Sequence, residues 1–154
     1  MRSFKGNQIA ISVFNQVGGL LPESVGVLVV EDYEPFRQFI SKVLQNGAGM
    51  RVVAEAADGL QAVRQAQELH PDLILLDIGL PALNGIETAR QILKISPSSK
   101  ILFVSENHSS EIVQEALSTG ACGYVLKSDV ATDLLPALKA VLEGKRFVSA
   151  NLTH

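Results

Sequence analysis

Apolar runs and helically spaced apolar residues follow one another along the chain in a repeating order. Residues 25–30 form an almost uninterrupted, valine-rich apolar run, which is typical of a strand buried on both faces of a sheet. After this run, apolar residues recur at helical spacing between Pro35, which suits a first helical turn, and Asn46-Gly47, which suits a helix end. The pattern predicts a strand followed by a helix.

The same unit recurs four more times. Further strands are predicted at residues 51–57, 72–78, 100–105 and 124–127, and further helices over about 60–69, 86–93, 112–117 and 134–142. His70-Pro71 ends the second helix, Gly120 suits the C-cap of the fourth, and Gly144 ends the last. Pro136 lies within the last helix near its first turns, where we expect a mild kink at most. Five strands alternating with five helices predict an α/β fold with a parallel sheet covered on both faces.

Composition narrows the class of protein. The chain has 154 residues, 47% of them hydrophobic and 19% charged, which suits one domain with its own core. A net charge of -3 argues against a nucleic-acid-binding surface, which needs a basic stripe. Cys122 is the only cysteine, so a reducing, cytoplasmic compartment is expected, with Cys122 as a small buried hydrophobic residue.

The regular pattern covers residues 25–148, which we interpret as the domain. Residues 1–24 are expected to be a flexible or partly helical extension, since they lack the pattern of a secretory signal. Residues 149–154 are interpreted as a tail or the start of a linker, with no DNA-reading module in this chain. No apolar run approaches the roughly 18 residues of a membrane span, so no membrane partner is expected.

Polar residues stand at the carboxyl ends of four predicted strands. Glu31 and Asp32 follow the first strand, Asp77 ends the third, Ser105 ends the fourth and Lys127 ends the fifth. In an open parallel sheet, ligands bind outside the carboxyl ends of the strands. We therefore expect three carboxylates, a hydroxyl and an ammonium group to converge at one edge.

This set of side chains suits metal-assisted phosphoryl transfer. Carboxylates that lie close together repel one another, and a divalent cation relieves the repulsion. Oxygen ligands suit Mg²⁺ (or Mn²⁺), and no His or Cys at these positions suggests zinc. An aspartate is a competent nucleophile toward phosphorus, while Mg²⁺ and Lys127 would offset charge and Ser105 would donate a hydrogen bond.

Each residue alone also fits a purely structural role. Glu31 and Asp32 fit a polar loop before a helix, Asp77 fits a helix cap, and Lys127 fits a solvated surface. Their joint arrangement at successive strand ends favours a functional site.

Four segments carry a family resemblance. They read Val-Leu-Val-Val-Glu-Asp at 27–32, Asp-Leu-Ile-Leu-Leu-Asp-Ile-Gly-Leu-Pro-Ala-Leu-Asn-Gly at 72–85, Ile-Leu-Phe-Val-Ser at 101–105 and Gly-Tyr-Val-Leu-Lys at 123–127. Together they resemble the response-regulator receiver domain of two-component signalling, a CheY-like superfamily. The wording of residues 119–127 resembles the NarL/FixJ branch. The resemblance implies a flavodoxin-like (βα)5 fold, a doubly wound five-stranded sheet with strand order 2-1-3-4-5.

The resemblance also implies roles for the site residues. Asp77 would be phosphorylated by a sensor histidine kinase or a phosphotransfer protein. Asp32, Asp77 and the backbone carbonyl of Gly79 would bind Mg²⁺, with Glu31 acting through a water. Lys127 would pair with the phosphoryl group, or with Asp77 before it arrives.

A switch is implied as well. Ser105 would move toward the phosphoryl group, Tyr124 would swing inward, and the fourth helix, fifth strand and fifth helix would form the output surface. A homodimer through that surface and a role in transcription regulation are family expectations. Such a domain is a signalling element that assists its own phosphorylation and dephosphorylation, and not an enzyme in the usual sense.

Several positions depart from the family pattern. Glu31 replaces the commoner Asp and Ser105 the commoner Thr, while Glu106 stands where a small residue is usual. Gly79 and Asn107 lie where the family tunes dephosphorylation.

Two alternatives stay open. Because of the bulky anion Glu106, the chain fits a pseudo-receiver, a protein-interaction module that works without phosphorylation. A nucleotide- or flavin-binding enzyme on a similar fold would need a glycine-rich loop after the first strand, where this chain has an acidic segment, residues 31–35.

Overall fold

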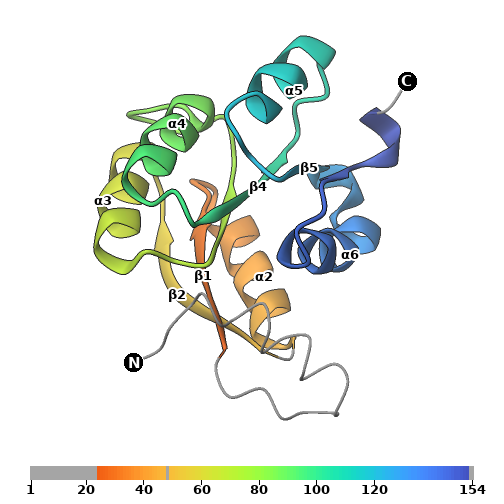
Figure 1. The fold of residues 1–154 in the computed structure, drawn as a ribbon. Coiled ribbons are helices and arrows are strands. Elements are labelled where there is room, and N and C mark those ends of the chain that lie inside the picture. The colour runs from red at the N-terminus through yellow and green to blue at the C-terminus, as the bar shows by residue number, and fades with distance from the viewer. Residues whose placement is uncertain (1–23, 48, 153–154) are drawn as a thin grey trace.

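The computed structural model describes residues 24–47 and 49–152, in which six parallel strands form one sheet with helices on both faces (Figure 1). The strands are β1 (Val25–Val30), β2 (Met50–Ala56), β3 (Leu73–Leu76), β4 (Lys100–Ser105), β5 (Gly123–Leu126) and β6 (Phe147–Val148). The helices are α2 (Glu34–Gln45), α3 (Gly59–Leu69), α4 (Gly85–Ile95), α5 (Ser110–Leu117) and α6 (Val130–Leu142), with short 3₁₀ helices η2 (Lys127–Asp129) and η3 (Ala150–Leu152). The sheet order is β2-β1-β3-β4-β5-β6, which confirms the predicted order of the first five strands.

Alternate strand residues enter two hydrophobic cores, one on each face of the sheet. In β1, Leu28 and Val30 join a core with α3, α4 and α5, whereas Val27 and Val29 join a core with α2 and α6. Figure 1 shows these two groups of helices on opposite sides of the strands. All residues of β1 and β3 are buried, because both faces are covered, which explains why these strands read as unbroken apolar runs.

Two predicted details are wrong, and one is confirmed. The sheet has a sixth strand, since Phe147–Val148 pairs with β5, and two residues are too few to give a periodic signal. Helix α5 has Ser118 at its C-cap, and Gly120 lies in the following turn, where its φ of +105° suits a residue without a Cβ. Pro136 lies within α6 near its first turns, as predicted, and the helix begins at Val130.

Other expectations have mixed outcomes. Cys122 is partly buried and packs against the core, so it is less enclosed than expected. The predicted extension lies almost wholly outside the described residues, which begin at Ser24. Within residues 24–47 and 49–152, every helix is too short or too polar to cross a membrane.

The segment after α6 is anchored by one buried serine. Ser149 is fully buried, and its backbone N–H donates to the carbonyl of Tyr124 (3.0 Å). Its hydroxyl accepts from the N–H of Leu126 (3.1 Å) and donates to a carboxylate oxygen of Asp133 (2.8 Å). This hydroxyl therefore satisfies a buried backbone donor of β5 and ties the segment to α6.

Removing that hydroxyl should destabilise the domain. We expect Ser149→Ala to lower the free energy of unfolding by about 1–3 kcal/mol, because the N–H of Leu126 loses its partner in a buried site. Urea unfolding followed by circular dichroism measures the change. Asn151→Ala removes exposed hydrogen bonds to Asp129 and should change stability by less than about 0.5 kcal/mol. Equal effects of the two variants would contradict the anchoring role of Ser149.

Candidate functional site

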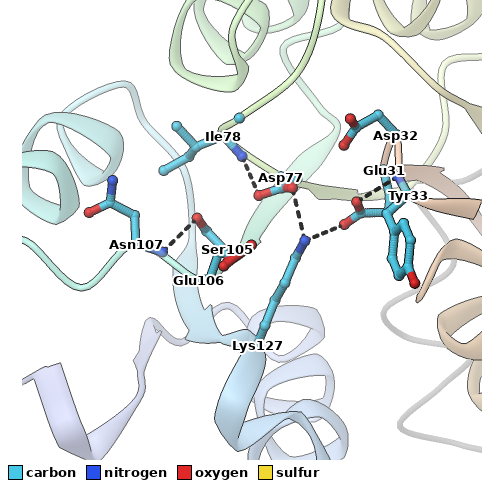
Figure 2. A pocket seen from close by; sticks show the side chains of 10 residues that line it. Glu31, Asp32, Tyr33, Asp77, Ile78, Ser105, Glu106, Asn107 and Lys127 are labelled. Atoms are coloured by element: carbon cyan, nitrogen blue, oxygen red, sulfur yellow. Dashed lines mark hydrogen bonds and ion pairs between the residues drawn. The ribbon is translucent and has the colours of Figure 1, made fainter. Parts of the chain in front are cut away.

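The carboxyl ends of β1, β3, β4 and β5 surround a pocket of about 460 Å³ (Figure 2). Its lining contains eight residues predicted from sequence: Glu31, Asp32, Asp77, Gly79, Ser105, Glu106, Asn107 and Lys127. The side chains come from segments up to 96 positions apart, and parallel strands bring them together because their carboxyl ends share one edge. Tyr124 is the predicted site residue that does not line this pocket.

Asp77 lies directly after β3 and is 6% exposed. One carboxylate oxygen accepts from the N–H of Ile78 (2.7 Å), and the other accepts from the ammonium of Lys127 (3.0 Å). Gly85 packs directly against the backbone of Asp77, since a Cβ on Gly85 would overlap the carbonyl oxygen of Asp77. Glycine is therefore required at residue 85 to hold this turn, and the turn holds Asp77 facing the pocket.

Glu31 uses both oxygens of its buried carboxylate. One accepts from the backbone N–H of Tyr33 (3.0 Å), and the other contacts the ammonium of Lys127 at 2.8 Å. Burial raises the pKa of Glu31, the hydrogen bonds from Lys127 and Tyr33 lower it in part, and the charge of Asp77 raises it further. Glu31 thus shapes the turn after β1 and holds the lysine.

Lys127 reaches up between Asp77 and Glu31 from the end of β5 (Figure 2). Its side chain is 16% exposed, and the ammonium also lies over the ring of Phe36, 4.8 Å from the centroid. Burial alone would lower the pKa of Lys127, but hydrogen bonds to Glu31 and Asp77 and attraction to both carboxylates raise it above its ordinary value. The lysine is therefore a firmly charged counter-ion to two carboxylates.

Ser105 and Tyr124 belong to neighbouring strands and meet the same loop. The hydroxyl of Ser105 accepts from the N–H of Asn107 (3.1 Å), at the lining of the pocket. The ring of Tyr124 is fully buried, and its hydroxyl donates to the carbonyl of Asn107 (2.6 Å). Burial raises the pKa of Tyr124, a hydrogen bond with Ser105 lowers it in part, and the charge of Asp77 raises it again. The side chain of Tyr124 therefore points into the protein interior.

Oxygen ligands for a cation gather at the open side of the pocket. One carboxylate oxygen from each of Glu31, Asp32 and Asp77 lies within 4.8 Å of the others. Asp32 is exposed, so water can complete a coordination shell there. Oxygen-only donors with access to water fit Mg²⁺, which keeps several waters in protein sites.

Two residues that the sequence singles out, Glu106 as a departure from the family pattern and Gly79 as a position that tunes dephosphorylation, line the pocket and are exposed. Glu106 is exposed and lines the pocket beside Ser105. Gly79 is exposed, and a Cβ placed on it would meet no atom within 4 Å.

Sequence reasoning missed four contributors to the site. Tyr33 and Ile78 supply backbone N–H groups to carboxylates, and Phe36 supplies a ring face to Lys127. Arg37 donates to the backbone carbonyl of Glu31. Backbone donors leave no signal in the sequence. The sequence places Phe36 and Arg37 on an amphipathic helix but does not indicate that they contact the site.

The chain is similar to proteins of a known family. Residues 27–139 match the response regulator receiver domain family. The nitrate/nitrite response regulator protein NarL of Escherichia coli K12 is 36% identical over 131 residues, which is 85% of this chain and 61% of that protein. The chain spans about 55–61% of the length of the curated relatives it matches.

Solved structures resemble the chain over most of its length. A two-component response regulator of the LuxR family from Aurantimonas sp. SI85-9A1 has a TM-score of 0.80 at 32% identity, covering 84% of this chain and 93% of that one. The isolated receiver domain of RcsB from Salmonella enterica serovar Typhimurium, solved with the phosphomimetic BeF3-, has a TM-score of 0.80 at 25% identity, covering 85% and 97%. The chain belongs to the response-regulator receiver family, and its relatives support the NarL/FixJ-like branch.

The charge of Lys127 should give the domain a pH-dependent stability. Because its folded-state pKa is raised, the stability it contributes is present below its usual pKa of 10.5 and is lost as pH rises through the higher folded-state value. We therefore expect wild type to be more stable than Lys127→Met at neutral pH without metal, and the difference to shrink above about pH 10.5. Urea unfolding of both proteins in EDTA between pH 7 and 11.5 measures it. A difference that stays constant would contradict the ion-pair role.

Proposed function

We propose that Asp77 accepts a phosphoryl group from a sensor histidine kinase or phosphotransfer protein, with Mg²⁺ bound, and that the α5–β5–α6 face transmits the change. An oxygen–phosphorus bond forms at Asp77 while the phosphorus–nitrogen bond to the donor's histidine breaks, and the histidine nitrogen takes up a proton. The single observation that carries the proposal is the placement of Asp77, which is buried, hydrogen-bonded on both oxygens and faces an open pocket lined by one ammonium and three more carboxylates.

The metal would be held by Asp32, Asp77 and the carbonyl of Gly79, with Glu31 acting through water. Bound there, it would neutralise the carboxylates and the charge that develops on the transferring phosphoryl group. The chain's own part is positioning: Ile78 and Lys127 orient Asp77, and Ser105 donates to a phosphoryl oxygen.

The change at Asp77 would reach the surface through the loop after β4. Movement of Ser105 toward the phosphoryl group would disturb its bond from Asn107, whose carbonyl holds the hydroxyl of Tyr124. Tyr124 lies on β5, within the proposed output face. A homodimer through that face and control of transcription by a longer protein are part of this proposal, whereas direct nucleic-acid binding by this acidic chain is not.

Phosphorylation of Asp77 is directly measurable. After incubation with acetyl phosphate and Mg²⁺, wild type should gain the mass of one labile phosphoryl group, and Asp77→Ala should gain none because its nucleophile is gone. Intact-protein mass spectrometry gives both results. Asp58→Ala is the matched control, since Asp58 follows β2 at the same edge of the sheet but caps α3.

Two outcomes would contradict the proposal. A gain that persists in Asp77→Ala would place the acceptor elsewhere. No gain in folded wild type would favour the pseudo-receiver, and the same assay on Glu106→Ala would then show whether the anion at the rim blocks the reaction.

Metal binding has its own readout. Mg²⁺ at about ten times its Kd should stabilise the fold by about 1.4 kcal/mol and raise the Tm, because the folded state gathers the carboxylates. Asp32→Asn should reduce this shift sharply, whereas Glu106→Gln should keep it, since Glu106 is outside the carboxylate cluster. Calorimetry with and without EDTA measures the shift. An unchanged shift in Asp32→Asn would exclude Asp32 as a ligand.

A further inference from the structure

Arg37 is a mostly enclosed cation beside the site, although it does not line the pocket. Its side chain is 15% exposed and extends from the first turns of α2 toward β1 and β2. One guanidinium nitrogen donates to the backbone carbonyl of Glu31 (2.9 Å), and the Nε donates to a carboxylate oxygen of Glu55 on β2 (2.9 Å). The other oxygen of Glu55 accepts from the buried hydroxyl of Ser41 (3.0 Å), so the guanidinium is itself held in place.

The carbonyl that Arg37 contacts lies at a break in the regular structure. The N–H of Glu31 still donates to the carbonyl of Ala56 (3.0 Å), one position beyond the end of β1. Helix α2 begins at Glu34, and its N-cap residue, Tyr33, makes no side-chain capping bond. Arg37 therefore fixes a carbonyl that neither the sheet ladder nor a helix cap holds.

The orientation of the Glu31 carbonyl also constrains the backbone between Glu31 and Asp32. The peptide unit is planar, so the orientation of the Glu31 carbonyl sets the direction of the bond to the Cα of Asp32. Both residues belong to the cluster whose oxygens lie within 4.8 Å of one another. Carboxylates this close repel one another. If the backbone already holds them together, cation binding costs less conformational entropy.

We propose that Arg37 is a positioning residue for the divalent-cation site: it fixes the peptide between Glu31 and Asp32 so that both carboxylates face the cation before it binds. This inference rests on the proposed function, because it concerns the same metal. Since the charge of Arg37 is already paired with Glu55, its contribution is geometric rather than a long-range electrostatic one. Outer residues that orient metal ligands commonly change metal affinity about 10–100-fold when replaced.

The test compares Mg²⁺ binding by wild type, Arg37→Met and Glu55→Gln, using isothermal titration calorimetry with Mg²⁺ alone. Arg37→Met keeps the apolar stem but loses both hydrogen bonds, and we expect its Kd for Mg²⁺ to rise about tenfold. Glu55→Gln removes the ionic partner but keeps an oxygen to accept from Arg37, so its Kd should stay close to that of wild type. If Arg37→Met does not fold, Arg37→Lys replaces it, because a single ammonium cannot reproduce the two-armed contact and should weaken binding to a lesser degree.

A second readout separates positioning from general damage. In the acetyl phosphate assay, Arg37→Met should need about tenfold more Mg²⁺ for half-maximal phosphorylation, while its rate at saturating Mg²⁺ returns to that of wild type. A merely structural role would lower stability and leave this Mg²⁺ dependence unchanged, which would overturn the proposal. Equal weakening by Glu55→Gln and Arg37→Met would overturn it too.

Failure of this inference and failure of the proposed function are distinguishable. If wild type binds Mg²⁺ and is phosphorylated but Arg37→Met binds Mg²⁺ equally well, only the role of Arg37 is refuted. If Mg²⁺ binding depends on Arg37 but no protein gains a phosphoryl group, Arg37 keeps its role and phosphorylation of Asp77 is refuted. If wild type binds no Mg²⁺, both are refuted.

Discussion

The charge balance around Lys127 is the interaction on which the site depends. Two buried carboxylates, Glu31 and Asp77, face each other across the edge of the sheet, and one ammonium group touches both at 2.8 and 3.0 Å. Without that cation, two negative charges would lie close together at buried residues, where water compensates them poorly. With it, both carboxylates have an ion-pair partner, and a group that competed for the lysine would disturb both ion pairs.

The same dependence on Lys127 suits the switching that we propose. Lys127 follows β5 directly, and Tyr124 lies on the same strand. Tyr124 is joined through the carbonyl of Asn107 to the loop that also holds Ser105. A new charge at Asp77 would therefore act on both ends of β5, once through the lysine and once through the tyrosine. A two-state change needs such a local charge difference acting on a bistable packed element.

The segment after α6 packs against two elements of the face that we propose for output, β5 and α6. Strand β6 pairs with β5 on its outer edge, and Ser149 binds β5 and α6 together. Tyr124 is thus contacted at its backbone by this segment and at its hydroxyl by the loop after β4. A homodimer through α5, β5 and α6 would have to accommodate β6 at its centre.

The sequence by itself determined the alternation of strands and helices, because strands buried on both faces must be apolar throughout. It also determined that Asp77, Ser105 and Lys127 lie at one edge, because the carboxyl ends of parallel strands coincide. Only the tertiary structure decided which donor meets which oxygen: Arg37 reaches Glu55 and the carbonyl of Glu31, and Ser149 reaches Leu126. Hydrophobic periodicity records which face of an element is buried, whereas these bonds join polar groups from segments far apart in the chain, and no local pattern encodes their meeting.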